Sequence, residues 1–389
     1  MNTSISLSTD HYRVGFLALN PPSHLFHLLP IAFELSKIRD VSVILYYSTN
    51  EIQQILEKYS EYYPGNKCEF VHLKTSIIHR LFRLFKRRPH PRVRHVIAHN
   101  LPRLLSHHAL VMTDKHMLKF KTADGPICIC ADHGAGDRQY GFSHVYKDFD
   151  FILFAGHAKR DRMLKAGIAD KSKGKIVGYP KFDPPLQTSN LESLFSNNNP
   201  IVIYAPHFNA NETSWYEWGL DVLEYFYQNP DFNLIFAPHV MLFAKRHPKL
   251  PEKYLNTDNI HIDYDSIRLS DMSYTKTADI YLGDVSSQIY EFIGYKIRPC
   301  IFLNPHHVSW QGKDDFRMWQ TGKIVEQIDN LDLALRTATE EFSTYRAVQE
   351  KIVEETFAPS PTSPGKRAAK AISDFLVDQG FEKNSLQNQ

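Results

Sequence analysis

Residues 278–292 read Ala-Asp-Ile-Tyr-Leu-Gly-Asp-Val-Ser-Ser-Gln-Ile-Tyr-Glu-Phe, and they show the unit from which we expect the fold to be built. An apolar run ends at Gly283-Asp284, and Ser286-Ser287 then provide capping residues, so this stretch predicts a strand that leads into a helix. The free amides and the dipole at the start of such a helix favour a phosphate group. Glu291 lies four residues after Ser287 on the same helix face, where it can accept a hydrogen bond from a ribose hydroxyl, although a plain capped helix is the alternative.

The same alternation of short apolar runs and helical-period segments extends in both directions from this stretch. In the first half, β-type runs at 14–18, 41–47, 127–130 and 151–154 alternate with helical patterns that include 24–37 and 157–166. After a polar, turn-rich stretch at 187–200, the pattern restarts with runs at 201–204, 234–236, 280–282 and 300–303. Such alternation predicts an α/β fold of two Rossmann-like domains with parallel sheets and a cleft between them.

These boundaries divide the chain into five segments. We expect an amino-terminal, acceptor-side domain over 1–183, with a basic helical insertion at about 74–109, and a linker over 184–199. A carboxyl-terminal, nucleotide-donor domain follows over 200–358. The Pro- and Ser-rich residues after 358 then break the chain before a crossing segment and last helix, 359–380, and a polar tail, 381–389.

The composition excludes several classes of protein. The 389 residues are 43% hydrophobic and 23% charged, which is ordinary globular usage and argues against a disordered chain. No apolar run reaches the length of a signal peptide core or a spanning helix, so we expect a cytoplasmic protein. Four cysteines are too few for a disulfide framework, and Cys128 and Cys130 occupy alternate positions of an apolar run, which is not zinc-ligand spacing. We therefore expect no metal and no cofactor.

Positive charge is concentrated in one band. The net charge is only +2, but residues 70–113 contain no Asp or Glu and nine Lys or Arg, while the remainder is acidic. Apolar residues recur at helical spacing within the band, so it can lie on an anionic membrane surface, or it can be a solvated face of the first domain. We expect an acceptor or membrane side here and no nucleic-acid binding, because no recognised module accompanies the band. The residues proposed for this side are Arg83, Lys86, Arg87, Arg88, Arg92 and Arg94.

Histidines follow three of the expected strands, where ligands of open α/β sheets bind. His133 stands in Asp132-His133-Gly134, and it is either a loop histidine or a general base for an acceptor hydroxyl. His207 and His239 each end an Ala-Pro-His triplet. Because proline cannot donate to a central ladder, each strand must stop there and present its histidine at the sheet edge, either as a ligand-binding group or as a plain strand end.

The order of these segments resembles the CDP-glycerol glycerophosphotransferase family, the teichoic-acid primase and polymerase group, whose members are similar to GT-B glycosyltransferases. The matching segments span about residues 127–340. They are Asp132-His133-Gly134, Gly178-Tyr-Pro-Lys-Phe-Asp183, Tyr204-Ala-Pro206, Pro238-His239, Ala278-Asp279 through Asp284-Val-Ser-Ser287 to Glu291, Arg298-Pro-Cys-Ile-Phe302 and Gly322-Lys-Ile-Val325.

The resemblance implies a transferase that moves a sugar or polyol-phosphate group from a nucleotide-activated donor, CDP-linked, to a cell-surface glycan or lipid-linked acceptor, as in teichoic-acid or capsule synthesis. His133 would be the base and His239 would lie near the donor diphosphate, both as catalytic residues. The CDP phosphates and ribose would bind Ser286, Ser287 and Glu291, and we place Tyr204, Pro206, His207 and Asp284 on the same donor side. Family members work at the cytoplasmic membrane face, so a peripheral location is expected.

The chain departs from the family around both substrates, so the transferred group stays open. His133-Gly-Ala-Gly136 stands where the family often has His-Gly-Thr-Pro, Lys181-Phe-Asp183 replaces an Arg-Asn-Asp, and His207-Phe-Asn follows Tyr204-Ala-Pro206 where the family has Thr-Trp and a carboxylate. Two other functions are open. One is a UDP-sugar 2-epimerase, which shares the architecture, and the other is a non-catalytic membrane-associated nucleotide-binding protein.

Overall fold

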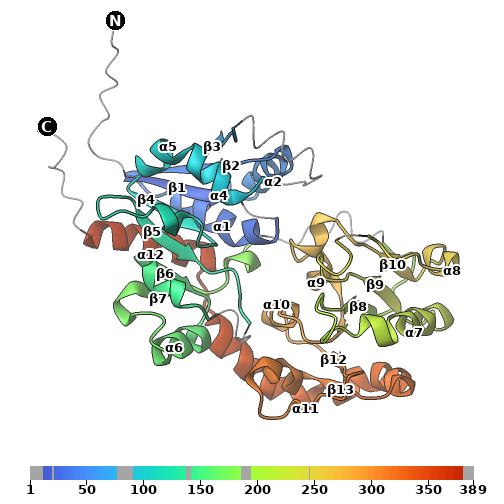
Figure 1. Ribbon diagram of the computed structural model, residues 1–389. Helices are drawn as coiled ribbons and strands as arrows, with labels where there is room; N and C mark the ends of the chain where they lie inside the picture. The colour runs from blue at the N-terminus through green and yellow to red at the C-terminus, as the bar shows by residue number, and fades with distance from the viewer. Residues whose placement is uncertain are drawn as a thin grey trace, which may run out of the picture. The chain divides into compact units, whose positions relative to one another are not determined.

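The computed structural model describes residues 12–19, 22–76, 91–136, 142–184, 194–244 and 246–379. The chain divides into two compact units (Figure 1). Unit 1 comprises Met1–His133, Ser143–Pro185 and Ala358–Gln389, and unit 2 comprises Gly134–Phe142 and Leu186–Phe357. The last segment of the chain therefore belongs to unit 1, and each unit has its own sheet.

Unit 1 is built on a parallel sheet of seven strands within the described residues, in the order β3-β2-β1-β4-β5-β6-β7. The strands are β1 Tyr12–Ala18, β2 Val41–Tyr47, β3 Glu69–His72, β4 Ala109–Met112, β5 Ile127–Ala131, β6 Phe151–Phe154 and β7 Gly174–Ile176. The helices are α1 Pro22–Leu35, α2 Asn50–Ser60, α4 Val93–His99, α5 Leu101–Leu105, α6 His157–Lys165 and α12 Pro364–Asp378, with short 3₁₀ turns η1 Met117–Phe120, η3 His144–Asp148, η4 Lys171–Lys173 and η5 Pro180–Phe182.

Unit 2 has a second parallel sheet, whose six described strands lie in the order β10-β9-β8-β11-β12-β13. The strands are β8 Ile201–Ala205, β9 Asn233–Phe236, β10 Ile260–Ile262, β11 Ile280–Gly283, β12 Cys300–Leu303 and β13 Lys323–Val325. The helices are α7 Trp215–Gln228, α8 Glu252–Leu255, α9 Ser273–Thr277, α10 Gln288–Tyr295 and α11 Leu331–Phe357, with 3₁₀ turns η7 Ile267–Leu269, η8 Asp314–Thr321 and η9 Ile328–Asn330.

The central strands are continuous apolar runs because helices cover both faces of each sheet. All four residues of β4, β6, β11 and β12 are buried. In unit 2 the core beneath α7 and α11 gathers aromatic side chains, including Tyr204, Phe226 and Phe236. The predicted fold class, two Rossmann-like parallel α/β units, is confirmed.

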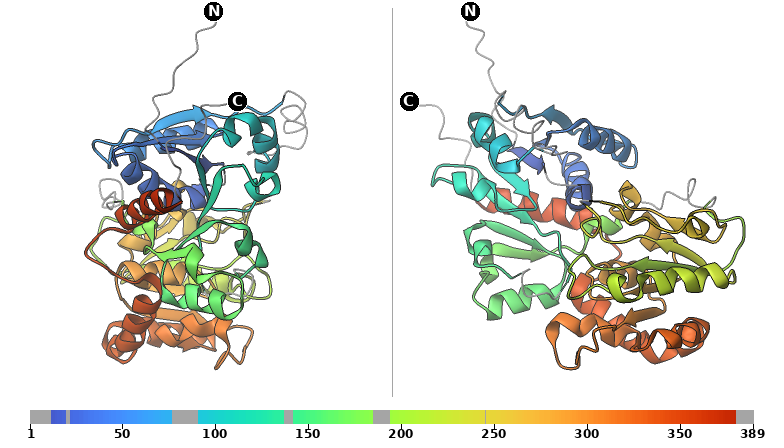
Figure 2. Two further views of the ribbon diagram at one scale, coloured as in Figure 1. Left: turned by 90° about the vertical axis from the view of Figure 1, so that its left-hand side faces the viewer. Right: turned by 45° about the vertical axis from the view of Figure 1, so that its right-hand side comes forward.

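The last helix, α12, completes the core of unit 1 and packs against α1, as two further views show (Figure 2). Phe375 on α12 stacks on Phe151 at a centroid distance of 4.2 Å. The amide of Gly365 donates to Asp183 Oδ2 at 2.6 Å, and burial raises the pKa of Asp183 to about 6. At Gly178 the backbone has φ +85°, and a Cβ there would lie 2.1 Å from Arg367 Nη2, so this turn needs glycine.

The described part of the basic band includes the helices α4 and α5. The helical pattern expected in the basic insertion is interrupted at Asn100, which separates α4 from α5. Arg92 and Arg94 lie on exposed positions at the start of α4. Arg83, Lys86, Arg87 and Arg88 lie outside the described residues, so the membrane role proposed for them stays a prediction.

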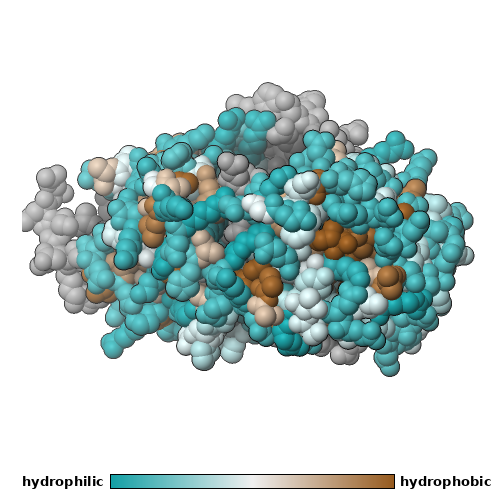
Figure 3. Space-filling model, turned by 90° about the horizontal axis from the view of Figure 1, so that it is seen from below, coloured by the Kyte–Doolittle hydropathy of each residue, from teal (hydrophilic) through white to brown (hydrophobic). Residues whose placement is uncertain are grey.

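The surface gives no sign of a membrane span in the described part of the chain. None of the helices there combines the length and apolar character needed to cross a bilayer. The face drawn in Figure 3 is mainly hydrophilic, and its apolar residues form separate small patches.

Candidate active site

Each sheet has one position where the strand order reverses, and the candidate residues gather there. In unit 1 this switch lies between β1 and β4, and in unit 2 between β8 and β11. Connections from the two neighbouring strands leave in opposite directions at a switch point, so they open a crevice beyond the carboxyl ends of the strands. The site in each unit can therefore be built from the residues that follow these strands.

In unit 1, His133 follows β5 and is held by the backbone after β4. Its Nδ1 lies 2.9 Å from the carbonyl oxygen of Thr113. A carbonyl can only accept, so Nδ1 carries the proton and donates to it, which leaves the lone pair of the neutral ring on Nε2. Burial lowers the pKa of His133, with Asp132 opposing this shift. The ring is thus neutral at pH 7, with an unprotonated Nε2.

Two further histidines on α1 complete a cluster around His133, and sequence reasoning missed both. The ring of His24 stacks on His133 with centroids 3.9 Å apart, and its Nδ1 lies 3.2 Å from Thr113 Oγ1. His27 is fully buried one turn further along, 6.4 Å from the His133 ring and 4.8 Å from that of Tyr179. The one available signal was that His24 follows closely on the first strand, the position at which His133, His207 and His239 were noticed.

The histidine cluster is kept neutral by its surroundings. Burial lowers the pKa of His24 to about 3, and His133 and Lys181 add to this effect. The pKa of His27 is lowered well below its ordinary value by burial, and next by Lys181. Lys181, in the segment that resembles the family, is itself buried beside α1, on η5. Burial and the charge of Lys181 together therefore keep the rings of His24 and His27 neutral at pH 7.

Asp132, the residue before His133, is part of a buried ion pair. Its Oδ2 pairs with the ammonium of Lys159 on α6, and both side chains are almost completely buried. Tyr146 OH donates to Asp132 Oδ1 at 3.2 Å. Because breaking one partner of a buried pair leaves an uncompensated charge, this pair fixes the loop that carries His133.

These pKa shifts predict how the stability of unit 1 depends on pH. The folded pKa of His24, about 3, lies below its unfolded value of 6.5. Between these values the unfolded chain binds the extra proton, so stability falls as the pH falls, by about 2 kcal/mol from His24 at pH 5. Urea unfolding at pH 7 and pH 5 measures this slope. His24→Gln should flatten it, whereas the matched change at exposed His157, His157→Gln, should leave it unaltered; equal slopes in all three proteins would contradict the assignment.

In unit 2 the two Ala-Pro-His triplets lie side by side and in register. Tyr204 pairs with Phe236 at the ends of β8 and β9, so the triplets continue the same alignment. The amide of His239 donates to the carbonyl of Pro206 at 3.0 Å, and the rings of His207 and His239 lie 5.7 Å apart. The strands end where the prolines predict, and both histidines reach the carboxyl edge of the sheet.

His239 is prepared as a hydrogen-bond donor. Its Nδ1 accepts from the amide of Met241 at 3.2 Å, so the proton of the neutral ring lies on Nε2. Burial lowers the pKa of His239 to about 4, which keeps the ring neutral at pH 7. The exposed ring of Phe208 lies 4.7 Å from it. His239 and His133 therefore carry their protons on opposite nitrogens.

Three of the predicted donor-binding residues are used inside unit 2. Asp284 is fully buried and accepts from His207 N at 2.9 Å, Ser214 N at 2.7 Å and Ser214 Oγ at 2.9 Å. Tyr204 is also fully buried, with its OH 2.9 Å from Ser214 Oγ. The His207 ring is 4% exposed, and its Nδ1 accepts from Asn209 N and lies 3.1 Å from Glu212 Oε2. In this structure these side chains hold the β8 and β11 ends together, and Pro206 contributes its carbonyl to His239.

The segment after β11 presents the start of α10. Ser287 is exposed at the N-cap position, and its side chain makes no capping bond, while the buried Ser286 accepts from Gln288 N at 3.3 Å. The prediction that both serines cap the helix is therefore correct only for Ser286, whose hydroxyl accepts from the amide of Gln288 in the first turn of α10. Glu291 lies one turn further along, partly exposed. The first-turn amides and Ser287 lie at the start of α10, and phosphate binding there stays a prediction.

No protein-family model matches the chain, and no curated protein sequence matches it. A solved form of the wall teichoic acid polymerase TagF, with one histidine changed to alanine, is similar over 97% of this chain and 91% of its own, with a TM-score of 0.64 and 13% identity. Another form of TagF, a histidine-to-asparagine variant soaked with CDPG, is similar over 96% of this chain and 90% of its own, with a TM-score of 0.61 and 14% identity.

The UDP-GlcNAc 2-epimerase from Neisseria meningitidis, bound to UDP-GlcNAc, is also similar. It covers 94% of this chain and 100% of its own, with a TM-score of 0.57 and 12% identity. This chain has the two-unit GT-B fold. The resemblance to the teichoic-acid polymerase group is confirmed in the fold, which nucleotide-sugar epimerases share, and identities this low show the fold alone.

Proposed function

We propose that this protein is a transferase that moves a sugar or polyol-phosphate group from a nucleotide-activated donor, CDP-linked, to a hydroxyl of a glycan or lipid-linked acceptor. The observation that carries the proposal is the state of His133, because a neutral ring with Nδ1–H fixed on the Thr113 carbonyl has Nε2 ready to accept a proton. A general base needs this protonation state and this orientation. The GT-B fold shared with TagF supports the reaction class.

In the proposed reaction each unit supplies one set of groups. The acceptor hydroxyl oxygen attacks the donor while its proton moves to His133 Nε2. The bond from the donor's phosphorus or anomeric carbon to the nucleotide oxygen breaks, and its electron pair leaves with the nucleotide. The first-turn amides of α10 and the Nε2–H of His239 stabilise the charge that develops on the leaving group.

A panel of CDP- and UDP-linked donors tests this function. With a glycan acceptor, we expect release of nucleotide and a labelled product from a CDP-linked donor. A UDP-sugar 2-epimerase is the second candidate, since such enzymes share the fold. Epimerised nucleotide sugar without acceptor would establish that candidate instead. No calorimetric binding of any nucleotide, together with binding to anionic liposomes, would favour a non-catalytic membrane-associated protein.

The donor side gives a prediction of its own. Glu291→Ala should raise the donor KM about tenfold with little change in kcat, because loss of one hydrogen bond to the ribose costs about 1.4 kcal/mol of uniform binding. Steady-state kinetics measure the effect. Donors lacking the 2′- or the 3′-hydroxyl sharpen the test, since the variant and the wild type should bind one of these analogues equally well.

The matched change on the exposed face of α11, Glu340→Ala, should leave KM unaltered. If Glu291→Ala loses the same factor with every donor, including both deoxy forms, Glu291 does not contact the ribose.

A further inference from the structure

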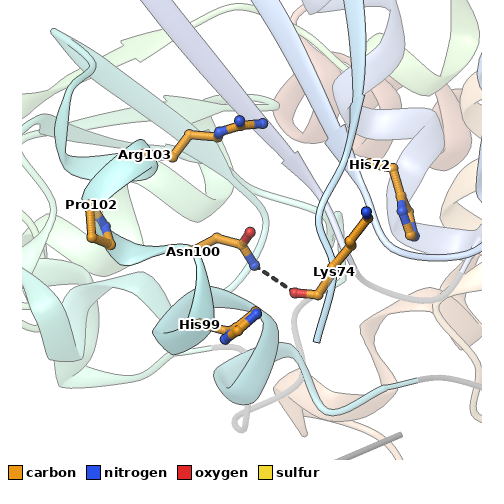
Figure 4. A pocket seen from close by; sticks show the side chains of 6 residues that line it. All are labelled: His72, Lys74, His99, Asn100, Pro102 and Arg103. Atoms are coloured by element: carbon orange, nitrogen blue, oxygen red, sulfur yellow. Dashed lines mark hydrogen bonds between the residues drawn. The ribbon is translucent and has the colours of Figure 1, made fainter. Parts of the chain in front are cut away.

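A pocket of about 580 Å³ lies in unit 1 beside the edge strand β3, apart from the histidine cluster. Its lining residues are His72, Lys74, His99, Asn100, Pro102 and Arg103. Figure 4 shows Lys74 and His72 on one side of the pocket and His99, Pro102 and Arg103 on the other side. His72 is the last residue of β3. In the sheet, β3 is separated by four strand-to-strand steps from β5, the strand that precedes His133, which corresponds to about 19 Å between the two strands.

The pocket is cationic, and no described carboxylate forms an ion pair with its two charged side chains. Lys74 and Arg103 are exposed and form no ion pair with any residue that the structure describes. The sequence from Phe70 to Thr113 contains no Asp or Glu at all. Glu69 is the nearest acid along β3; it and Arg103 both act electrostatically on Tyr46, but no described ion pair joins Glu69 to Lys74 or Arg103.

The backbone that carries these cations is fixed. Asn100 Nδ2 donates to the carbonyls of Lys74 at 2.9 Å and Val96 at 2.7 Å, and thereby ties the segment after β3 to the end of α4. His107 Nδ1 lies 3.1 Å from the carbonyl of Arg103, and the neighbouring Leu104 is fully buried. The backbone segments on the two sides of the pocket are therefore fixed relative to each other before a ligand binds, which lowers the entropic cost of binding.

We propose that this pocket binds a phosphate group. Arg103 offers a planar fork of N–H donors and Lys74 an ammonium, which together match the oxygens of a phosphate, and the imidazoles of His72 and His99 can add hydrogen bonds. The binding itself does not depend on the proposed transfer reaction. If that reaction is correct, the pocket holds a phosphate of an anionic acceptor that lies several residues or sugar units away from its reacting hydroxyl, so longer acceptors bind more tightly.

Inorganic tripolyphosphate tests the site on the full chain by calorimetry. We expect the double variant Lys74→Gln, Arg103→Gln to weaken its binding at least tenfold and to reduce the salt dependence of binding. The matched double variant Lys58→Gln, Lys67→Gln removes two exposed cations of the same unit and should bind like the wild type. Equal loss in both double variants, or no binding by the wild type, would overturn the proposal. Thermal unfolding verifies that each variant is folded.

A second pair of measurements identifies the source of the phosphate. Vesicles of phosphatidylglycerol and of phosphatidylcholine test a lipid headgroup, and a soluble phosphodiester oligomer tests an acceptor chain. In both arms the Lys74, Arg103 variant should bind more weakly than the control variant, and the arm with the larger difference names the source. No difference in either arm would refute the site. None of these assays contains a nucleotide donor, so failure of the proposed reaction leaves them unaffected.

Discussion

His133→Ala should lower kcat for transfer by about 10² to 10⁴-fold while the affinity for the nucleotide stays the same. The substitution removes the proposed base, whereas the proposed donor-binding residues at the ends of β8 and β11 belong to unit 2 and do not include His133. An interaction used only in the transition state affects kcat and kcat/KM together. Single-turnover kinetics with a saturating donor measure the chemical step, and calorimetry with the free nucleotide measures binding.

The control for this prediction is His157→Ala, which removes an exposed histidine from the start of α6. It should retain normal transfer. Thermal unfolding verifies that His133→Ala is folded, since the substitution removes the stack on His24 as well as the hydrogen bond to the Thr113 carbonyl. Near-normal transfer by a folded His133→Ala protein would show that another group takes the proton.

Asp284→Ala should destabilise the protein by about 3 to 5 kcal/mol. The substitution leaves His207 N, Ser214 N and Ser214 Oγ without their buried acceptor, and each such group costs about 1 to 3 kcal/mol. Burial raises the pKa of Asp284 to about 6, and the three hydrogen bonds act in the opposite direction. The folded state therefore holds the proton more tightly than the unfolded chain, so the stability linked to this group declines as the pH rises from about 4 to 6.

Urea unfolding at pH 7, followed by tryptophan fluorescence, measures the loss. Asp284→Asn keeps one acceptor oxygen and should lose about half as much stability. Asp258→Ala removes an exposed carboxylate from the same unit and should change stability by less than about 0.5 kcal/mol. If Asp284→Ala keeps the wild-type midpoint but weakens nucleotide binding, Asp284 is a ligand-binding residue as the sequence predicted, and its structural role is wrong.

Eight of the thirteen described strands could be predicted from apolar runs, whereas β3, β4, β7, β10 and β13 were not among those predicted. The runs at 41–47, 151–154 and 300–303 coincide with β2, β6 and β12. The prolines of the two Ala-Pro-His triplets also marked the ends of β8 and β9 correctly. Proline removes a ladder donor wherever it stands, so this signal needs no knowledge of distant residues.

The partners of the site residues could not be predicted in this way. His24 and His133 stack although 108 residues lie between them, and Lys159 neutralises Asp132 from α6. Asp284 stands in a motif that suggested a ligand, yet three donors from the β8 side enclose its carboxylate. Such contacts depend on which strands become neighbours, and strand order is set by the packing of the whole unit.

By itself, then, the sequence determined much of the local structure: where many of the strands end, that a helix begins at Ser287, and that residues 70–113 carry positive charge without an acid. Only the tertiary structure decided which nitrogen of His133 is free, which carboxylates are used internally, and that Lys74 and Arg103 line one pocket. The physical reason is the sequence separation of the residues that interact. Helix capping, strand ends and local charge depend on residues a few positions apart, whereas tautomers, burial and pocket walls depend on groups brought together from distant strands.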